Sequence, residues 1–89
     1  MTYKTILKAA HKHSIFNKVE VLKSKLCGCF YCLAIFAPAE IKEWTDEENT
    51  KGMTALCPYC GIDAVVGENS GYPINNENFL KAMNERWFN

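Results

Sequence analysis

The chain has 89 residues, of which 48% are hydrophobic and 22% are charged, so it suits one small domain and is too apolar to be disordered. Its formal net charge is zero, whereas a nucleic-acid-binding domain is usually strongly basic. It contains no apolar run of about 18 residues, and its N-terminus lacks the apolar stretch and cleavage site of a secretory signal. We therefore expect a cytoplasmic protein with no membrane partner.

The first 25 residues predict two helices. Apolar side chains from Tyr3 to Ala10 recur at helical spacing, and lysines recur every four residues on another face, which predicts an amphipathic helix over 3–13. Asn17 opens an Asn-x-x-Glu pattern typical of a capping box, which predicts a second helix to about residue 23. Val19 and Leu22 are expected on its inner face, and the two helices are expected to form a hairpin over residues 1–25.

Four of the five cysteines form two Cys-x-x-Cys pairs, Cys29-Phe-Tyr-Cys32 and Cys57-Pro-Tyr-Cys60, separated by residues 33–56. Such a turn points both sulfurs the same way, and two facing turns supply the tetrahedral sulfur shell that a structural Zn²⁺ ion prefers. In a reducing compartment, clustered cysteines are metal ligands more often than disulfides. The spacing therefore predicts one structural zinc ion bound by these four cysteines, with iron in the same shell as the alternative.

Cys27 competes for a place in the first pair. A pair of Cys27 and Cys29 would have only one residue between its thiols, whereas Cys29 with Cys32 makes the enclosed Phe-Tyr the counterpart of Pro-Tyr in the second pair. The two pairs are therefore expected to be structural counterparts, and Cys27 is interpreted as a small buried side chain beside the site. An accessory thiol that exchanges with a ligand or senses oxidant stays open for Cys27.

Short strands and one helix are predicted between and after the cysteine pairs. The apolar runs 33–36 and 53–56 and the β-branched run 62–67 predict strands. Pro38 suits the first turn of a helix, and Ile41 and Trp44 lie three residues apart, which predicts a helix over 38–44. The polar residues of 45–52 predict a solvated loop.

A last helix is predicted over residues 75–88, after a connection over 67–73 that is rich in turn residues. Asn75 is its predicted N-cap, and Ile74 is expected to pack on Phe79 as a hydrophobic staple. Apolar side chains recur every four residues from Phe79 to Trp87. This face is interpreted as core packing against the cysteine pairs, and a partner-binding face is the alternative if its aromatic end is exposed.

The charges divide the chain into two parts. Residues 1–25 carry six lysines and one glutamate, a charge of +5, whereas residues 26–89 carry four basic and nine acidic side chains, a charge of −5. Either the basic helices lie on the acidic part, or Lys4, Lys8 and Lys12 contact an anionic partner such as nucleic acid. The first is favoured, because lysines usually form the solvated face of an amphipathic helix and Arg86 is the only arginine.

No catalytic motif accompanies the predicted metal site. Cys57-Pro-Tyr-Cys60 matches the glutaredoxin active-site tetrapeptide, but a thiol redox site needs its first cysteine at the start of a helix, and a β-branched run follows Gly61. His11 and His13 are not spaced as a helical zinc pair and are expected at the surface, with a hydrogen bond to a thiolate as the alternative. Four cysteines leave a metal no open position, so we expect no enzyme and infer no small-molecule substrate.

Two resemblances follow from these motifs. The paired knuckles, with Pro-Tyr and Gly61 in the second, resemble those of zinc-ribbon proteins, in which two knuckles on β-hairpins hold one structural metal. From about residue 11 onward the chain resembles a family of small bacterial cytoplasmic proteins to which no activity is assigned. That second resemblance rests on Cys27-Gly-Cys-Phe-Tyr-Cys32, Phe36-Ala-Pro38, Glu40-Ile-Lys-Glu-Trp44, Thr54-Ala-Leu-Cys-Pro-Tyr-Cys-Gly61 and Gly71-Tyr-Pro-Ile74. It implies the same four cysteine ligands.

The sequence thus predicts a single α+β domain over residues 1–89. A zinc-ribbon-like β centre with two knuckles (26–67) is expected between an N-terminal helical pair (1–25) and a C-terminal helix (75–88). The predicted function is that of a non-catalytic zinc-binding adaptor, with a protein partner favoured over nucleic acid. A nucleic-acid-binding zinc ribbon is the alternative, and a thiol redox protein using Cys57 and Cys60 is the second alternative.

Overall fold

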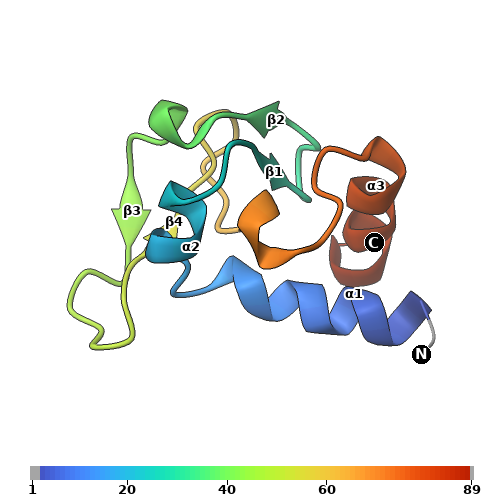
Figure 1. Cartoon of the computed structure of the whole chain (residues 1–89), viewed down its shortest axis with the longest axis horizontal. Helices are drawn as coiled ribbons and strands as arrows, with labels where there is room; N and C mark the ends of the chain where they lie inside the picture. Colours follow the sequence, from blue (N-terminus) through green and yellow to red (C-terminus); the bar gives the residue numbers. More distant parts are fainter. Residues whose placement is uncertain (1–2, 89) are drawn as a thin grey trace.

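The computed structural model describes residues 3–88, and Figure 1 shows the order of their elements along the chain. Short antiparallel strands lie at the centre and helices stand at both ends, so the predicted α+β class is confirmed. The elements are α1 (Tyr3–His11), the 3₁₀ turn η1 (Lys12–Ser14), α2 (Lys18–Leu22), β1 (Cys27–Cys29), β2 (Ile35–Phe36), the 3₁₀ turn η2 (Pro38–Glu40), β3 (Trp44–Thr45), β4 (Thr54–Ala55), β5 (Val65–Gly67), the 3₁₀ turn η3 (Glu68–Ser70) and α3 (Glu77–Phe88).

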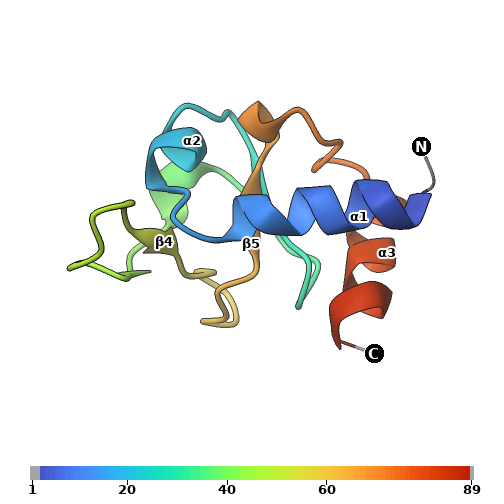
Figure 2. The ribbon, with the colours of Figure 1, turned by 90° about the horizontal axis from the view of Figure 1, so that it is seen from below.

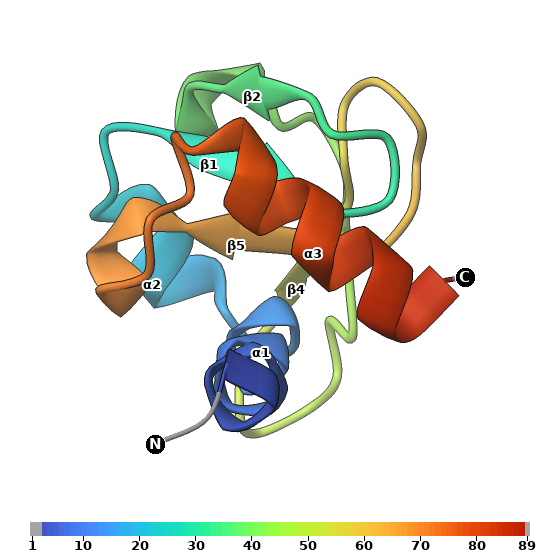
Figure 3. The same cartoon turned by 90° about the vertical axis from the view of Figure 1, so that its right-hand side faces the viewer.

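A three-stranded antiparallel sheet in the order β2-β1-β5 forms the centre of the fold. Within it, Cys27 of β1 pairs with Phe36 of β2 on one side and with Gly67 of β5 on the other. The C-terminal segment lies directly on β1, where a Cβ atom at Gly28 would stand 2.6 Å from the Cγ2 atom of Ile74. The missing side chain therefore lets α3 cover this face of the sheet (Figure 3).

The first predicted helix is present as α1, and its last predicted residues continue as the tighter turn η1. Leu7 and Ala10 are buried on its inner side. Together α1 and η1 lie across β5 and beside α3 (Figure 2). The amphipathic spacing thus identified the helix and its buried face correctly, because that face has a sheet and a second helix to pack on.

The second predicted helix is present as α2, but it turns a different face to the core. Val21 is fully buried, whereas Val19 and Leu22, which were predicted to face inward, are 68% and 54% exposed. The reason is a close approach to β5, because a Cβ atom at Gly67 would lie 3.2 Å from the Cα atom of Val21. The predicted hairpin of two helices is also not the main packing, since α1 lies against α3 while α2 lies against β5 and η3.

Asn17 precedes α2 as predicted, but its side chain forms no capping hydrogen bond, so the predicted capping box is wrong. Its Nδ2 atom donates instead to the carbonyl oxygens of His13 and Val65, both at 2.8 Å, and its Oδ1 atom accepts from the backbone N–H of Ala55 at 3.1 Å. Glu20, the other predicted member of the box, pairs with His13. The buried amide of Asn17 therefore ties the helical segment to β4 and β5.

The helix predicted over 38–44 is only one turn long. The backbone N–H of Ile41 donates to the carbonyl of Pro38 at 3.1 Å, which closes η2, and Ile41 is then extended at ψ 122°. Trp44 lies in β3, where it pairs with Ala55 of β4 in a separate two-stranded sheet. Burial of Ile41 and this strand pairing prevail over the local helical spacing.

The C-terminal helix α3 begins one residue later than its predicted cap implies. Asn76, not Asn75, is the cap, since its Oδ1 atom accepts from the backbone N–H of Asn78 at 2.9 Å. Phe79 and Met83 are buried, which confirms that much of the predicted face as core. The face does not stay buried to its end, because Phe88 is exposed.

Candidate metal centre

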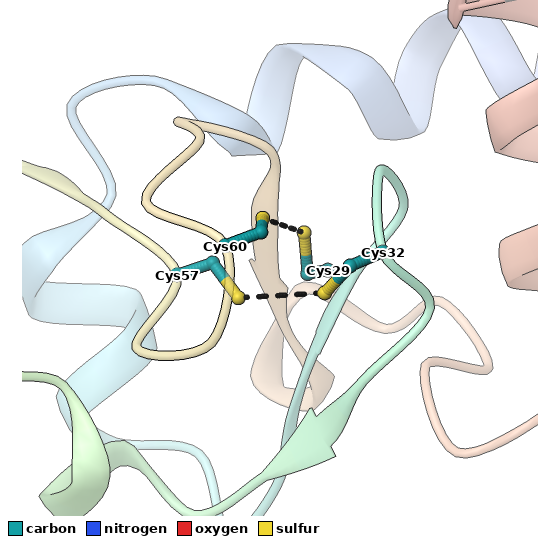
Figure 4. Close-up of side chains that lie close together, drawn as sticks. All are labelled: Cys29, Cys32, Cys57 and Cys60. Carbon is teal, nitrogen blue, oxygen red and sulfur yellow. Dashed lines mark hydrogen bonds between the residues drawn. The ribbon is translucent and has the colours of Figure 1, made fainter.

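The first Cys-x-x-Cys pair lies in the turn between β1 and β2. Cys29 ends β1, its backbone N–H donates to the carbonyl of Ala34 at 2.9 Å, and its carbonyl accepts from the N–H of Leu33 at 2.8 Å. Leu33 adopts a positive φ of 69°, a conformation that a leucine rarely adopts. This tight turn presents Cys29 and Cys32 from the same side of the chain (Figure 4).

The second pair repeats this pattern bond for bond. Here the backbone N–H of Cys57 donates to the carbonyl of Ile62 at 3.0 Å, and the N–H of Gly61 donates to the carbonyl of Cys57 at 2.9 Å. Gly61 has a φ of 78°, matching the positive φ at the equivalent position of the first turn. A glycine adopts this conformation without steric cost. The two turns are therefore structural counterparts, as their sequences predicted.

The four sulfur atoms meet between the two turns (Figure 4). The Sγ atoms of Cys29 and Cys60 lie 3.7 Å apart, as do those of Cys32 and Cys57, and all four lie within 4.8 Å of one another. A tetrahedral ion with metal–sulfur bonds of about 2.3 Å would separate its ligand atoms by about 3.8 Å. The four predicted ligands thus form a site with the dimensions of a metal-binding centre.

Backbone N–H groups also point at the sulfurs in matching positions. Tyr31 donates to the Sγ atom of Cys29 and Tyr59 donates to that of Cys57, each at 3.4 Å. Burial raises the pKa of the Cys29 thiol well above its usual range and also raises the pKa of Cys60. For Cys57, burial is opposed by the N–H groups of Tyr59 and Cys60, and its pKa is lowered. A bound cation would supply the charge that keeps all four sulfurs deprotonated, so binding releases protons.

Each turn is held from outside by a side chain that the sequence did not reveal. The Nδ2 atom of Asn84, on α3, donates to the carbonyl oxygens of Phe30 and Tyr31 between the first two cysteines, both at 3.0 Å. At the second turn, the Tyr59 hydroxyl donates to the Glu40 carboxylate at 2.6 Å. Asn84 belongs to no motif, and the motif that contains Glu40 gave no hint of this contact, so only their placement in the fold identifies the two roles.

Cys27 lies outside the sulfur cluster. Its side chain is fully buried, and burial raises the pKa of its thiol to about 12. Because reactive cysteines are exposed and have lowered pKa values, this environment agrees with the packing role predicted for Cys27. Its role as an accessory thiol stays a prediction without a structural feature in its favour.

The thiol redox alternative lacks the helix that it needs. Residues 58–60 form a turn, and the chain after Gly61 leads into β5 rather than into a helix. No helix dipole therefore points at Cys57, whereas helix N-termini activate the thiols of such redox sites.

The predicted anion contacts and histidines are not part of the four-sulfur cluster. Lys4, Lys8 and Lys12 are exposed, and none forms an ion pair with another residue of 3–88. His13 is half-buried, and its Nδ1 atom lies 2.8 Å from the Glu20 carboxylate. His11 is also half-buried, and its ring centroid lies 4.1 Å from that of Trp87, so both histidines, predicted at the surface, are partly exposed and contact other side chains.

Comparisons with known proteins add no assignment to this geometry. A scan against protein-family models found no match, and searches of the curated proteins and of the solved structures found none either. Among residues 3–88, no helix has the length and apolar character needed to cross a membrane.

Proposed function

We propose that this protein binds one structural zinc ion through Cys29, Cys32, Cys57 and Cys60 and serves as a non-catalytic binding module. The observation that carries the metal assignment is the sulfur spacing, 3.7 Å in two pairs, which fits a tetrahedral thiolate shell. Zinc is chosen over iron because it is the usual ion of structural four-cysteine sites. Bound there, the ion would supply cross-linking between the two turns and no open position for a substrate.

Elemental analysis of freshly purified protein tests the metal assignment. One zinc per chain is the expected result, and visible absorption from iron bound to thiolates should be absent. A chain that carries iron at full occupancy would replace zinc by iron in the proposal. A chain that carries no transition metal, yet folds, would contradict the structural metal altogether.

A protein partner is the favoured ligand of the module, because Val19 and Leu22, which the sequence predicted on the inner face of α2, are exposed together with the nearby Ile15. Ile15, which follows η1, and Val19 and Leu22 of α2 are 49%, 68% and 54% exposed within eight consecutive residues. Exposed apolar side chains that lie close together are a common property of protein interaction sites. The test is a pull-down from the source cell with wild-type protein and a Val19→Lys, Leu22→Lys variant. Capture of the same partner by both would exclude this segment.

Nucleic acid is the second candidate, and the exposed lysines of α1 favour it. Because Lys4, Lys8 and Lys12 have no acidic partner among residues 3–88, their charge is available to phosphates. Filter binding at increasing salt tests this with the three lysines changed to Gln, against a control in which Lys23, Lys42 and Lys51 are changed instead. Affinity that is insensitive to salt, or lost equally in both variants, argues against phosphate contacts along α1.

A further inference from the structure

A cavity of about 320 Å³ lies beside the metal centre, where four separate parts of the chain meet. Its walls include the rings of His11, Phe30, Trp87 and Phe88, together with the polar side chains of Ser14 and Asp63. These residues come from α1, η1, the first cysteine turn, the link between the second cysteine turn and β5, and α3. Small-molecule sites are typically concave, lined by apolar and aromatic side chains, and supplied with a few polar groups.

Three polar groups around this cavity lack hydrogen-bond partners in the described part of the chain. Neither the His11 imidazole nor the Asp63 carboxylate forms a side-chain hydrogen bond with any residue of 3–88. The indole Nε1 of Trp87 is buried and is likewise unpartnered within 3–88. A buried donor without an acceptor costs about 1–3 kcal/mol, so an acceptor that reached it would stabilise the protein.

The ring walls are held in fixed positions. Trp87 contacts two side chains: the ring centroid of His11 lies 4.1 Å from that of the indole, and the Arg86 guanidinium carbon lies 4.5 Å from the indole centroid. Phe30 in turn contacts both His11 and Phe88, with centroid separations of 5.8 and 5.7 Å. Burial is the main cause that lowers the pKa of His11, so its imidazole is neutral at pH 7 and offers one donor and one acceptor. Flat apolar walls and an unpaired carboxylate, imidazole and indole N–H together suit a planar ring with polar edges.

We propose that this cavity binds a nucleobase, with guanine as the base whose edge fits it best. Guanine presents two adjacent N–H donors, which a carboxylate such as Asp63 accepts together, and a carbonyl acceptor beside them, which suits the N–H groups of His11 and Trp87. Bases held by proteins outside a duplex are stacked on aromatic side chains and hydrogen-bonded along such edges. Lys12 follows His11 directly and Lys8 stands one helical turn before it; neither lines the cavity, but both are exposed and supply positive charge on the same helical segment for a phosphate attached to the base.

The inference goes beyond the binding role proposed above and does not depend on which metal is bound. The base can come from a free nucleoside, a nucleotide or a single strand. Isothermal titration of the full metal-loaded protein with guanosine, inosine, adenosine, guanosine monophosphate and a short guanine-containing single strand separates these sources. Inosine lacks the exocyclic amine of guanine, and adenosine lacks its carbonyl, so the expected order of affinity is guanosine, inosine, adenosine.

Two conservative variants test the assigned contacts, and Trp44→Phe is the matched control outside the cavity. Asp63→Asn keeps the size of an exposed side chain and should weaken guanosine binding about ten-fold or more while reducing its advantage over adenosine. Trp87→Phe keeps an apolar ring, removes the N–H donor, and should weaken binding to a similar extent. Trp44→Phe should leave the affinity unchanged. Elemental analysis of each variant shows whether the metal centre is intact.

The outcomes show which kind of molecule supplies the base and whether the cavity binds it. If guanosine monophosphate binds more tightly than guanosine, and if this added affinity falls with rising salt and in Lys8→Gln, the ligand is a nucleotide. If the guanine-containing single strand binds more tightly still, the ligand is single-stranded nucleic acid. Guanosine that binds equally well to Asp63→Asn, Trp87→Phe and wild type overturns the assignment of the cavity. Absence of binding in every arm, with one metal per chain, overturns the inference and leaves the proposed metal centre standing.

Discussion

Replacing Cys60 and Cys27 by alanine, one at a time, separates metal ligation from ordinary burial. Cys27 is fully buried in β1 and Cys60 is partly exposed, so burial alone predicts that Cys27→Ala is the more destabilising change. Metal ligation predicts the reverse, because the Sγ atom of Cys60 lies 3.7 Å from that of Cys29 inside the four-sulfur cluster, whereas Cys27 lies outside it. Burial and metal ligation thus predict opposite orders of stability for the two variants, so measuring both variants decides between them.

The expected magnitudes differ by several kcal/mol. Removing one buried methyl-sized group costs about 1 kcal/mol, so Cys27→Ala should lower Tm by about 4–8 °C in a domain of this size and keep one metal per chain. Structural zinc contributes about 10–16 kcal/mol of apparent binding energy in small domains, as much as or more than the typical total stability of about 5–15 kcal/mol. Loss of a quarter of the ligand shell should therefore abolish cooperative unfolding in Cys60→Ala.

Thermal unfolding followed by circular dichroism, with metal content measured on the same samples, provides the assay. Cys60→Ala should match wild-type protein treated with a chelator, and Cys27→Ala should match untreated wild type apart from its lower Tm. If Cys60→Ala retains one metal per chain and melts within a few degrees of Cys27→Ala, the cluster does not stabilise the fold and the structural role is wrong.

Four further expectations concern single side chains. Asn84→Ala removes both hydrogen bonds to the first turn and should weaken metal affinity about ten-fold or more in a chelator competition, as loss of a supporting group around a metal site typically does. Asn17→Ala leaves the carbonyl of Val65 and the N–H of Ala55 without these buried partners and should cost about 2–6 kcal/mol in denaturant unfolding, while retention of full stability would contradict the tie to both strands. Asn76→Ala should cost about 1 kcal/mol as a lost helix cap, whereas Asn75→Ala should be neutral; equal effects would contradict the cap assignment. Burial lowers the pKa of His11 in the folded chain below its ordinary value of 6.5, so the unfolded chain takes up the proton first as pH falls. The free energy of unfolding should therefore decrease below about pH 6.5, and this decrease should be smaller in His11→Phe.

The metal centre was predictable because its geometry is local. A Cys-x-x-Cys turn fixes the direction of both sulfurs within a few residues, and the same two backbone bonds close both turns, at Leu33 and at Gly61. The helices α1 and α3 were predictable for a similar reason, since their apolar spacing repeats over several turns. What the pattern of cysteines could not show was which parts of the chain hold the turns in place.

The errors arose where contacts distant in sequence decide the local structure. Asn17 has the spacing of a helix cap, but its amide bonds to β4 and β5, 38 and 48 residues away. Trp44 has the spacing of a helical face, but pairing with Ala55 places it in β3. The close approach of α2 to Gly67 turns Val21 inward and its neighbours outward. The intrinsic secondary-structure propensity of a short segment is a weak indicator of its final structure, because such tertiary contacts override it.

The anchors of the two turns explain why metal binding and folding should be coupled in this chain. Asn84 holds the first turn from α3, near the C-terminal end of the chain, and Glu40 holds the second from η2, in its middle. The first turn connects β1 to β2, whereas the second turn lies between β4, which pairs with β3, and β5, which pairs with β1. An ion bound by Cys29 and Cys60 across this junction would therefore reinforce the contacts that already join the two turns, which are the β1–β5 pairing and the hydrogen bond from the N–H of Phe30 to the carbonyl of Ala64. Each anchor limits how far its own turn can move, so an ion would find its four ligands already arranged only when both turns are held in the folded chain.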